Sequence, residues 1–147
     1  MPNYHRRRVP GGTYFFAVNL YNRRLWLLTD HIETLRASFR LVQSAHRFYI
    51  DAIIVLPEHL HCIWTLPQGD DDYSSRWRLI KSAFSRTLPR VEAMSKSRAR
   101  KQERGVWQRR FWEHAITNED DYTEHVDYIH YNPVKHGYVA RPIDWPH

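Results

Sequence analysis

Cysteine is nearly absent from this chain of 147 residues, which contains Cys62 alone. A single cysteine excludes an intrachain disulfide and fits a reducing compartment, so we expect a cytoplasmic protein. Long hydrophobic runs are absent too. The longest purely apolar run, residues 52–56, is far shorter than the roughly 20 residues that span a bilayer. The arginines near the N-terminus precede no apolar segment, so we expect no secretory signal and no membrane partner.

The motifs of several common protein classes are also missing. The chain has no Gly-x-x-x-x-Gly-Lys phosphate loop, no Gly-x-Ser-x-Gly elbow, no paired-cysteine zinc signature and no dinucleotide-binding fingerprint. These absences point away from nucleotide hydrolases, α/β-hydrolases, zinc fingers and dinucleotide-dependent enzymes. Any chemistry must therefore come from less familiar groupings of residues.

Positive charge is concentrated in one part of the chain. The net charge is +6, but residues 76–110 hold twelve Lys or Arg against two Glu, a local charge of +10, so the remainder sums to −4. Such a basic block commonly contacts a polyanion. Part of it, residues 95–105, also has the composition of a solvated loop. The aromatic content of 14% offers stacking surface for unpaired bases, besides filling a core.

The length is that of one domain, 1–147, which we divide into a basic N-terminal arm at 1–11, a folded body and the basic loop at 95–105. Apolar periodicity predicts strands at about 13–20, 48–57, 59–67 and 105–117, and helices at about 31–47, 77–88 and 118–133. Asp30 with Glu33 predicts the start of the first helix. Asn118 is the expected cap of the last helix, and Pro133 its expected end.

This order of elements, βαββαβ with an added C-terminal helix, predicts an α+β fold of the ferredoxin-like (RRM-like) type. Such a fold has an antiparallel sheet with two helices on one face. The second and third strands, joined at Pro57 and Glu58, are expected to form a hairpin. The other face of the sheet is then open for a site.

Two histidines stand in the otherwise apolar stretch PEHLHCIW. Because side chains alternate along a strand, His59 and His61 share one face while Leu60, Cys62 and Trp64 share the other. Same-face neighbours lie roughly 6.5–7 Å apart, so both imidazoles can reach one metal ion. A His-x-His pair also occurs as ordinary hydrogen-bonded residues of a half-exposed strand. The spacing permits a metal site and does not require one.

The C-terminal helix brings three polar side chains to one flank of its buried stripe. That stripe recurs at i, i+4 and i+7 as Tyr122, Val126 and Ile129. Tyr128 and Asn132, four residues apart, lie one above the other beside it, and His125 falls on the same flank. A tyrosine can act as a nucleophile that forms a covalent intermediate, and a divalent ion can polarise a phosphate. The alternative for Tyr128 is a structural tyrosine at the rim of the core. The alternative for Asn132 is a residue at the end of the helix that precedes a turn.

Together these motifs resemble one known family. PEHLHCIW and, some seventy residues later, YIHYNPVKHGYV are similar to the single-tyrosine HUH transposases, and within them to the REP-associated tyrosine transposases. The bulky residue between the histidines is Leu60, and Glu58 stands where an asparagine commonly precedes the first histidine. RWRLIKSAFSR and WQRRFWEHAI resemble the same branch, so the similarity covers most of the chain from about residue 12 onward.

The resemblance implies a metal-dependent single-stranded DNA endonuclease and strand transferase that acts at hairpin-bearing repeats. It implies that Tyr128 is the nucleophile, which forms a 5′-phosphotyrosine link and frees a 3′-hydroxyl. It also implies that His59, His61 and Asn132 hold Mg²⁺ or Mn²⁺, although the same donors accept Zn²⁺. On geometric grounds we add His125 as a third ligand or proton acceptor. Relatives leave both a monomer and a homodimer open.

A DNA substrate also requires cationic side chains along the phosphate backbone. Our candidates are Arg76, Arg78, Lys81, Arg109 and Arg110, with Arg6, Arg7 and Arg8 as an arm. Each of these residues taken alone is equally typical of a charged surface side chain that contacts only solvent. The alternative hypothesis is a catalytically inactive single-stranded nucleic-acid-binding module on the same fold. A repressor of duplex DNA would need a helix-turn-helix motif, which is not evident in the sequence.

Overall fold

The structure, a computed structural model, describes residues 8–88 and 105–147. Its strands form one antiparallel sheet in the order β2-β3-β1-β4. They are β1 (Thr13–Asn19), β2 (Tyr49–Val55), β3 (His59–Thr65) and β4 (Trp112–Ala115). The helices are α1 (Leu27–Asp30), α2 (Ile32–Ala45), α3 (Tyr73–Thr87), α5 (Glu119–Lys135) and the 3-10 turn η1 (Pro142–Asp144). This arrangement confirms the predicted ferredoxin-like α+β fold with an added C-terminal helix.

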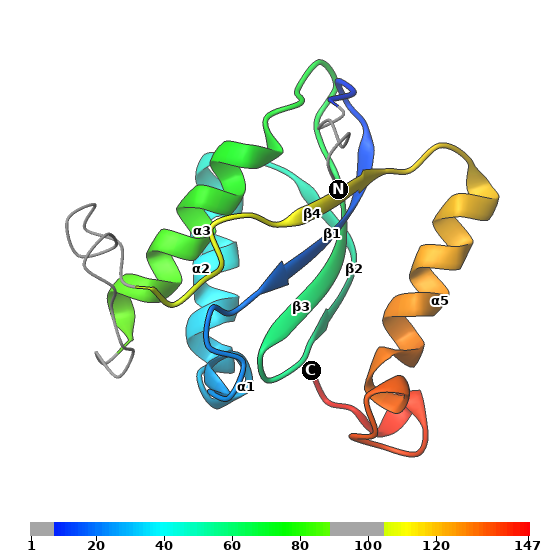
Figure 1. Cartoon of the computed structure of the whole chain (residues 1–147). Coiled ribbons are helices and arrows are strands. Elements are labelled where there is room, and N and C mark those ends of the chain that lie inside the picture. Colours follow the sequence, from blue (N-terminus) through cyan, green and yellow to red (C-terminus); the bar gives the residue numbers. More distant parts are fainter. Residues whose placement is uncertain (1–7, 89–104) are drawn as a thin grey trace.

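The sheet lies between two helical layers. Helices α2 and α3 lie side by side against one face, and α5 lies across the other (Figure 1). The alternation of β3 decides which side chains meet which layer. Leu60, Cys62 and Trp64 are buried in the core cluster that includes side chains of α2 and α3. His59 and His61 face the α5 side, as predicted, although α5 partly covers the face expected to be open.

The aromatic content of the chain is largely used in the core beneath α2 and α3. Trp64 and Trp77 stack with ring centroids 4.4 Å apart, and Phe16 and Phe39 pack edge-on against Trp77. Each such side chain contributes on the order of 1.5–3 kcal/mol by burial. The apolar cluster under α5 is much smaller, and its buried members are Phe15, Ile54, Ile63 and Ile129. The sheet therefore owes most of its apolar packing to the α2–α3 face.

The predicted start of the first long helix is wrong. Asp30 belongs to the short helix α1, and α2 begins after His31, which makes no side-chain cap hydrogen bond. Glu33 does not close a capping box because its carboxylate pairs with Arg36 at 2.6 Å. Glu33 therefore pairs with a side chain one turn along the helix, and the start of α2 has no side-chain cap.

The last strand and the last helix also differ from their predicted bounds. β4 covers only four residues, while Trp107, inside the predicted strand, makes an isolated bridge to Leu20. Asn118 caps α5 as predicted, since its side chain accepts the Asp121 amide at 2.8 Å. Pro133 does not end the helix. It removes one helical hydrogen bond near the C-terminus, but the helix continues to Lys135.

The structure also bears on the expected absence of a membrane segment. Within residues 8–88 and 105–147, no helix combines the length and the apolar character needed to cross a bilayer.

Candidate active site

The two histidines of β3 lie together on the α5 side of the sheet. Their ring centroids are 5.0 Å apart and nearly perpendicular, and both side chains are buried. Leu60 between them points into the opposite core, which fixes the strand in the register that presents both imidazoles. The pair therefore has the proximity that a shared metal ion requires.

A carboxylate orients the first histidine. The Oε1 atom of Glu58 lies 2.9 Å from Nδ1 of His59 and 3.6 Å from the Arg23 guanidinium, and the Tyr138 hydroxyl donates to Oε2 at 3.3 Å. Because Nδ1 is held by a carboxylate, Nε2 is the nitrogen left to bind a ligand. Sequence analysis missed this role for Glu58, although a carboxylate adjacent to a candidate ligand is a signal that could have indicated it.

Helix α5 sets a line of side chains opposite the histidines at intervals of four residues. The Tyr128 ring lies 5.2 Å from that of His61, and the His136 ring lies 5.1 Å from that of His59. Asn132 stands between Tyr128 and His136 on the same side of the helix. The structure thus brings Tyr128 and Asn132 to the histidine pair, as predicted, and adds His136. Its spacing of four from Asn132 could have indicated it.

Asn132 is buried without a protein partner. Only 1% of the residue is exposed, and neither its amide oxygen nor its amide nitrogen has a hydrogen bond within the described residues. Nδ1 of His61 is also buried and unpartnered there. A buried polar group left unsatisfied costs roughly 1–3 kcal/mol. Coordination of a metal ion by the amide oxygen and an imidazole nitrogen would offset part of this cost, so the residues present fit a metal.

Burial keeps both imidazoles in the neutral form. Burial is the main cause that lowers the pKa of His61 to about 3, and unfavourable electrostatic interactions with the neighbouring His59, His136 and Lys135 add to it. Burial also lowers the pKa of His59, and this effect outweighs the opposing influence of the Glu58 carboxylate. Both rings are therefore uncharged near neutral pH, and the neutral imidazole is the form that binds a metal.

The structure places His125 in a different group. Its Nδ1 donates to the Asp121 carbonyl at 2.8 Å and lies 3.0 Å from the Asp121 carboxylate, which also binds Nε2 of His114 at 2.8 Å. The Phe15 ring packs against both His125 and His61, at 4.7 and 5.5 Å. His114, Asp121 and His125 form a second donor group that could hold a metal. Sequence reasoning identified the flank of His125 but not these partners.

Arg76 is a structural residue. It is 4% exposed, and its guanidinium binds both carboxylate oxygens of Asp70 at 2.7 and 3.0 Å. Its other hydrogen bonds go to the carbonyl groups of His46, Arg47 and Asp72. All five N–H donors of the side chain are thus used. The prediction that Arg76 contacts DNA phosphate is therefore wrong, because the residue ties the start of α3 to the end of α2.

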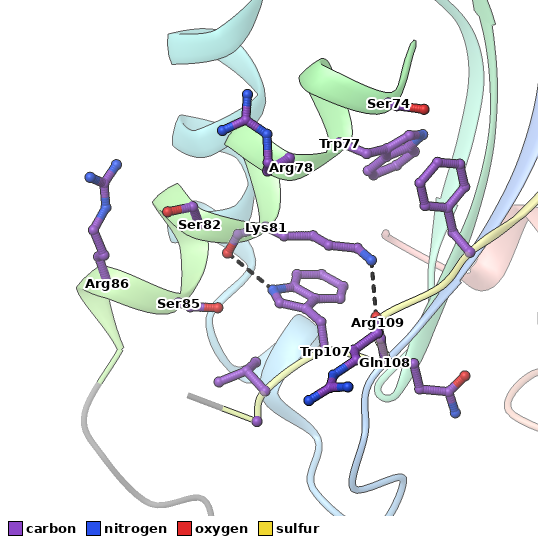
Figure 2. Close-up of a pocket in the computed structure, with 13 residues that line it drawn as sticks. Ser74, Trp77, Arg78, Lys81, Ser82, Ser85, Arg86, Trp107, Gln108 and Arg109 are labelled. Carbon is purple, nitrogen blue, oxygen red and sulfur yellow. Dashed lines mark hydrogen bonds between the residues drawn. The ribbon is translucent and has the colours of Figure 1, made fainter. Parts of the chain in front are cut away.

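The remaining cationic candidates of this region lie at the surface. Arg78, Lys81 and Arg109 line a cavity of about 550 Å³ between α3 and residues 105–111 (Figure 2). Arg110 is exposed next to it in the chain. The predicted phosphate contacts therefore remain predictions for the three exposed arginines, whereas Lys81 is partly buried.

The arm predicted at the N-terminus is described only at its end. Arg8 is exposed, and its guanidinium lies 6.0 Å from the centroid of the Tyr73 ring. Arg6 and Arg7 lie outside the described residues, as does the predicted basic loop apart from Gly105.

The strand register places one further aromatic residue on the face of the candidate site. Ala17 of β1 pairs with His61 on one side and with Trp112 of β4 on the other, so all three side chains share this face. Trp112 is 42% exposed. Neighbouring strands are about 4.8 Å apart, which puts Trp112 roughly 10 Å from His61 across a small side chain. Sequence analysis missed Trp112 because its position depends on the pairing of β4.

Comparison with known proteins gives close relatives of one kind. No protein-family model matches the chain. The REP-associated tyrosine transposase of Escherichia coli (strain K12) is 51% identical over 146 residues, which are 99% of this chain and 81% of the relative. A putative REP-associated tyrosine transposase of Haemophilus influenzae is 43% identical over 148 residues, with 100% of this chain and 84% of the relative covered.

Solved structures agree with these relatives. The structure of a REP-associated tyrosine transposase bound to a REP hairpin matches with a TM-score of 0.84 and 51% identity, over 99% of this chain and 81% of that chain. A putative transposase from Deinococcus radiodurans, 15% identical with a TM-score of 0.54 over 86% of this chain and 95% of that chain, shows likeness of fold alone. The family and the histidine-containing donor groups together indicate a metal cofactor. The chain belongs to the REP-associated tyrosine transposases, enzymes of the single-tyrosine type.

Proposed function

We propose that this transposase is a metal-dependent single-stranded DNA endonuclease and strand transferase that acts at hairpin-bearing repeats. The observation that carries the proposal is a partly exposed tyrosine, Tyr128, 5.2 Å from the ring of His61 and one helical turn from the buried amide of Asn132. A relative whose solved structure is bound to a REP hairpin supports a hairpin as the substrate.

The chemistry assigned to Tyr128 is an exchange of phosphate esters. Its phenolic oxygen attacks the phosphorus of the scissile linkage, forming one P–O bond while the bond to the 3′-oxygen breaks. The phenol gives up its proton, and the departing 3′-oxygen takes one up. The 5′-phosphotyrosine link retains the energy of the phosphodiester, so a 3′-hydroxyl can reverse the step or join another strand without a nucleotide cofactor.

The residues around Tyr128 are suited to hold the phosphate in position. His59, His61 and Asn132 would bind a divalent cation, Mg²⁺ or Mn²⁺, which supplies Lewis-acid polarisation of a phosphate oxygen when bound. The Lys135 ammonium lies 5.2 Å from the centroid of the Tyr128 ring and adds positive charge where the phosphate would dock.

The same face offers a stacking surface for the DNA. Trp112 is exposed roughly 10 Å from His61, across the small side chain of Ala17. Unpaired bases stack on exposed aromatic rings with little regard to sequence. We propose that a base close to the scissile phosphate stacks on Trp112.

The decisive test is covalent capture. Labelled single-stranded hairpin oligonucleotides are incubated with the protein and Mg²⁺, Mn²⁺ or a chelator, and a protein-linked band is sought on a denaturing gel. We expect a metal-dependent adduct that Tyr128→Phe abolishes while DNA binding is kept. Tyr131→Phe is the matched control, because Tyr131 lies on the same helix and is 61% exposed. An adduct that survives Tyr128→Phe would disprove the assigned nucleophile, and binding without any adduct would favour the inactive binding module.

A further inference from the structure

A second group of metal-ligand side chains lies at the start of α5, apart from the histidine pair of β3. It consists of His114 from β4 with Asp121 and His125 from the first turns of α5, and one donor atom of each lies within 4.8 Å of the others. The Phe15 ring packs against both His125 and His61, with ring centroids 4.7 and 5.5 Å apart. An aromatic side chain, rather than a shared donor, therefore connects the two groups.

Strand register and helix period bring the three side chains together. His114 of β4 pairs with Phe15 of β1, so both side chains lie on the face of the sheet that α5 covers. Asp121 and His125 are four residues apart and share one side of α5. Only residues 116–118 separate β4 from α5 (Figure 1). The group therefore joins the edge strand to the helix that carries Tyr128.

Both imidazoles direct a nitrogen toward one oxygen atom. Oδ1 of Asp121 lies 3.1 Å from Nε2 of His114 and 3.0 Å from Nδ1 of His125. In a tetrahedral site with bonds of about 2.0–2.2 Å, neighbouring ligand atoms are roughly 3.3–3.6 Å apart. The three donor atoms are thus already close to the spacing that one bound ion requires, and small side-chain movements would admit it.

The segment before α5 orients the carboxylate. Oδ2 of Asp121 accepts hydrogen bonds from the backbone amide and the hydroxyl of Thr117, at 2.9 and 3.2 Å, besides its contact with His114 at 2.8 Å. Partners of this kind hold a ligating carboxylate in position. Burial raises the pKa of Asp121, but hydrogen bonds from Thr117 and His114 bring the pKa below its ordinary value of 3.8. The carboxylate is therefore ionised near neutral pH.

The donor set and its exposure favour a transition-metal ion. All three side chains are partly buried, so an ion can enter from solvent and a water molecule can complete its coordination. Two imidazoles, one carboxylate and a water form a ligand set that proteins use for Zn²⁺, whereas Mg²⁺ prefers oxygen ligands alone. The carboxylate also supplies a negative charge, which the histidine pair of β3 and Asn132 do not.

We infer that His114, Asp121 and His125 bind one transition-metal ion of the Zn²⁺ class, separate from the ion proposed at the histidine pair of β3. The ion cross-links β4 to the first turns of α5. Each imidazole then carries its proton on its other ring nitrogen, and His125 gives up its hydrogen bond to the Asp121 carbonyl. This inference does not depend on the proposed function.

The test is a count of bound Zn²⁺. Protein stripped with a chelator is titrated with Zn²⁺ by calorimetry, and the metal retained after gel filtration is measured by elemental analysis. His114→Gln with His125→Gln should bind one ion fewer than the parent, with the affinity at this site reduced at least about 100-fold. His46→Gln with His130→Gln, which changes two exposed histidines outside the group, is the matched control and should bind as the parent does.

Variants of the histidine pair of β3 separate the two sites. His59→Gln with His61→Gln should keep the Zn²⁺ ion bound by His114, Asp121 and His125. One ion that is lost only in the His114 and His125 variant would support the inference even if the active-site metal proposed above were absent. A parent protein whose only bound ion is lost with His59 and His61 would overturn it.

Hydrogen exchange locates the cross-link without relying on variants that fail to fold. Zn²⁺ should slow exchange of the backbone amides of residues 122–128 in the parent protein, because the ion holds these turns of α5 to β4. Asp121→Asn, which keeps an acceptor for Thr117, should lose this slowing and supplies a second variant if the double histidine variant unfolds. Zn²⁺ that leaves exchange of these amides unchanged would overturn the inference, and the group would then be a hydrogen-bonded network only.

Discussion

Two buried polar side chains, Arg76 near the start of α3 and Asn132 in the last turns of α5, have opposite surroundings. Arg76 satisfies all five N–H donors with one carboxylate and three backbone carbonyl groups. The amide of Asn132, exposed to only 1%, has no hydrogen-bond partner in the part of the chain that the structure describes. A satisfied group of this kind holds elements together, whereas an unsatisfied one costs free energy that a ligand can recover.

The difference separates the parts of the molecule that maintain the fold from those that are ready for chemistry. The α2–α3 face carries the large aromatic core and the Arg76 network. The α5 face carries a small apolar cluster, the neutral histidine pair and the unpartnered amide. Substitutions on the two sides should therefore change different measured quantities, stability on one side and strand transfer on the other.

The largest expected effect on stability comes from Arg76. Arg76→Met removes five hydrogen bonds, two to the Asp70 carboxylate and three to backbone carbonyl groups, so the free energy of unfolding should fall by about 3 kcal/mol. Urea denaturation measures this change, and the exposed residue Arg40, changed to Met, is the control. Adduct formation per folded molecule should stay near the parent value. A stable Arg76→Met protein with weakened DNA binding would reverse our assignment of this residue.

Asn132 should show the converse behaviour. Asn132→Leu removes no protein hydrogen bond, so unfolding should change by less than about 1 kcal/mol. Loss of a proposed metal ligand should reduce covalent adduct formation by at least about 100-fold. His130→Leu, on the exposed side of the same helix, provides the control. If Asn132→Leu unfolds the protein and His130→Leu does not, the amide has a structural partner and the comparison fails.

Trp112 should have a smaller effect, confined to DNA binding. Trp112→Ala should weaken binding of single-stranded hairpin substrates by about 1–3 kcal/mol if a base stacks on the ring. Trp26, which is 57% exposed at the start of α1, gives a matched control as Trp26→Ala. Fluorescence anisotropy measures both affinities. Equal affinities of the two variants would contradict the proposal that a base stacks on Trp112.

The smallest effect is a dependence of stability on acid pH. Hydrogen bonds from Arg76 hold the pKa of Asp70 below its ordinary value of 3.8. The ion pair therefore stabilises the folded state fully above that value, and the contribution disappears as pH falls through the lower folded-state pKa. Urea midpoints of the parent and of Asp70→Asn should differ by a constant amount above about pH 5 and converge in stronger acid. A difference that grows in acid would contradict the assignment.

The alternation of side chains along β3 made it possible to predict from the sequence which face of the sheet carries the candidate site. The apolar residues Leu60 and Trp64 required one face of β3 to be buried under helices, and this turned His59 and His61 to the other. The stripe ending at Ile129 likewise fixed the flank of α5. These patterns are local, with periods of two and about 3.6 residues, so a single segment carries the information.

Contacts between distant segments were not predictable in this way. The Arg76 partners His46 and Arg47 lie about thirty residues away and are backbone carbonyl groups, which no side-chain pattern reveals. The sequence therefore predicted that Arg76 is an exposed cationic side chain. The exposure of Trp112 beside the site follows from the pairing of β4 with β1. Pro133 predicts a helix end because proline removes one helical hydrogen bond, yet α5 continues to Lys135.

Ala17 links His61 to Trp112 through the register of the sheet. Strands generally favour β-branched and aromatic residues, yet a methyl group stands here between a candidate ligand and a candidate stacking surface. Among homologues, the residue type at this position should therefore be limited by side-chain volume rather than chosen for strand propensity. Glycine and serine should be tolerated among functional homologues, whereas valine and isoleucine should be rare even though they would strengthen the strand.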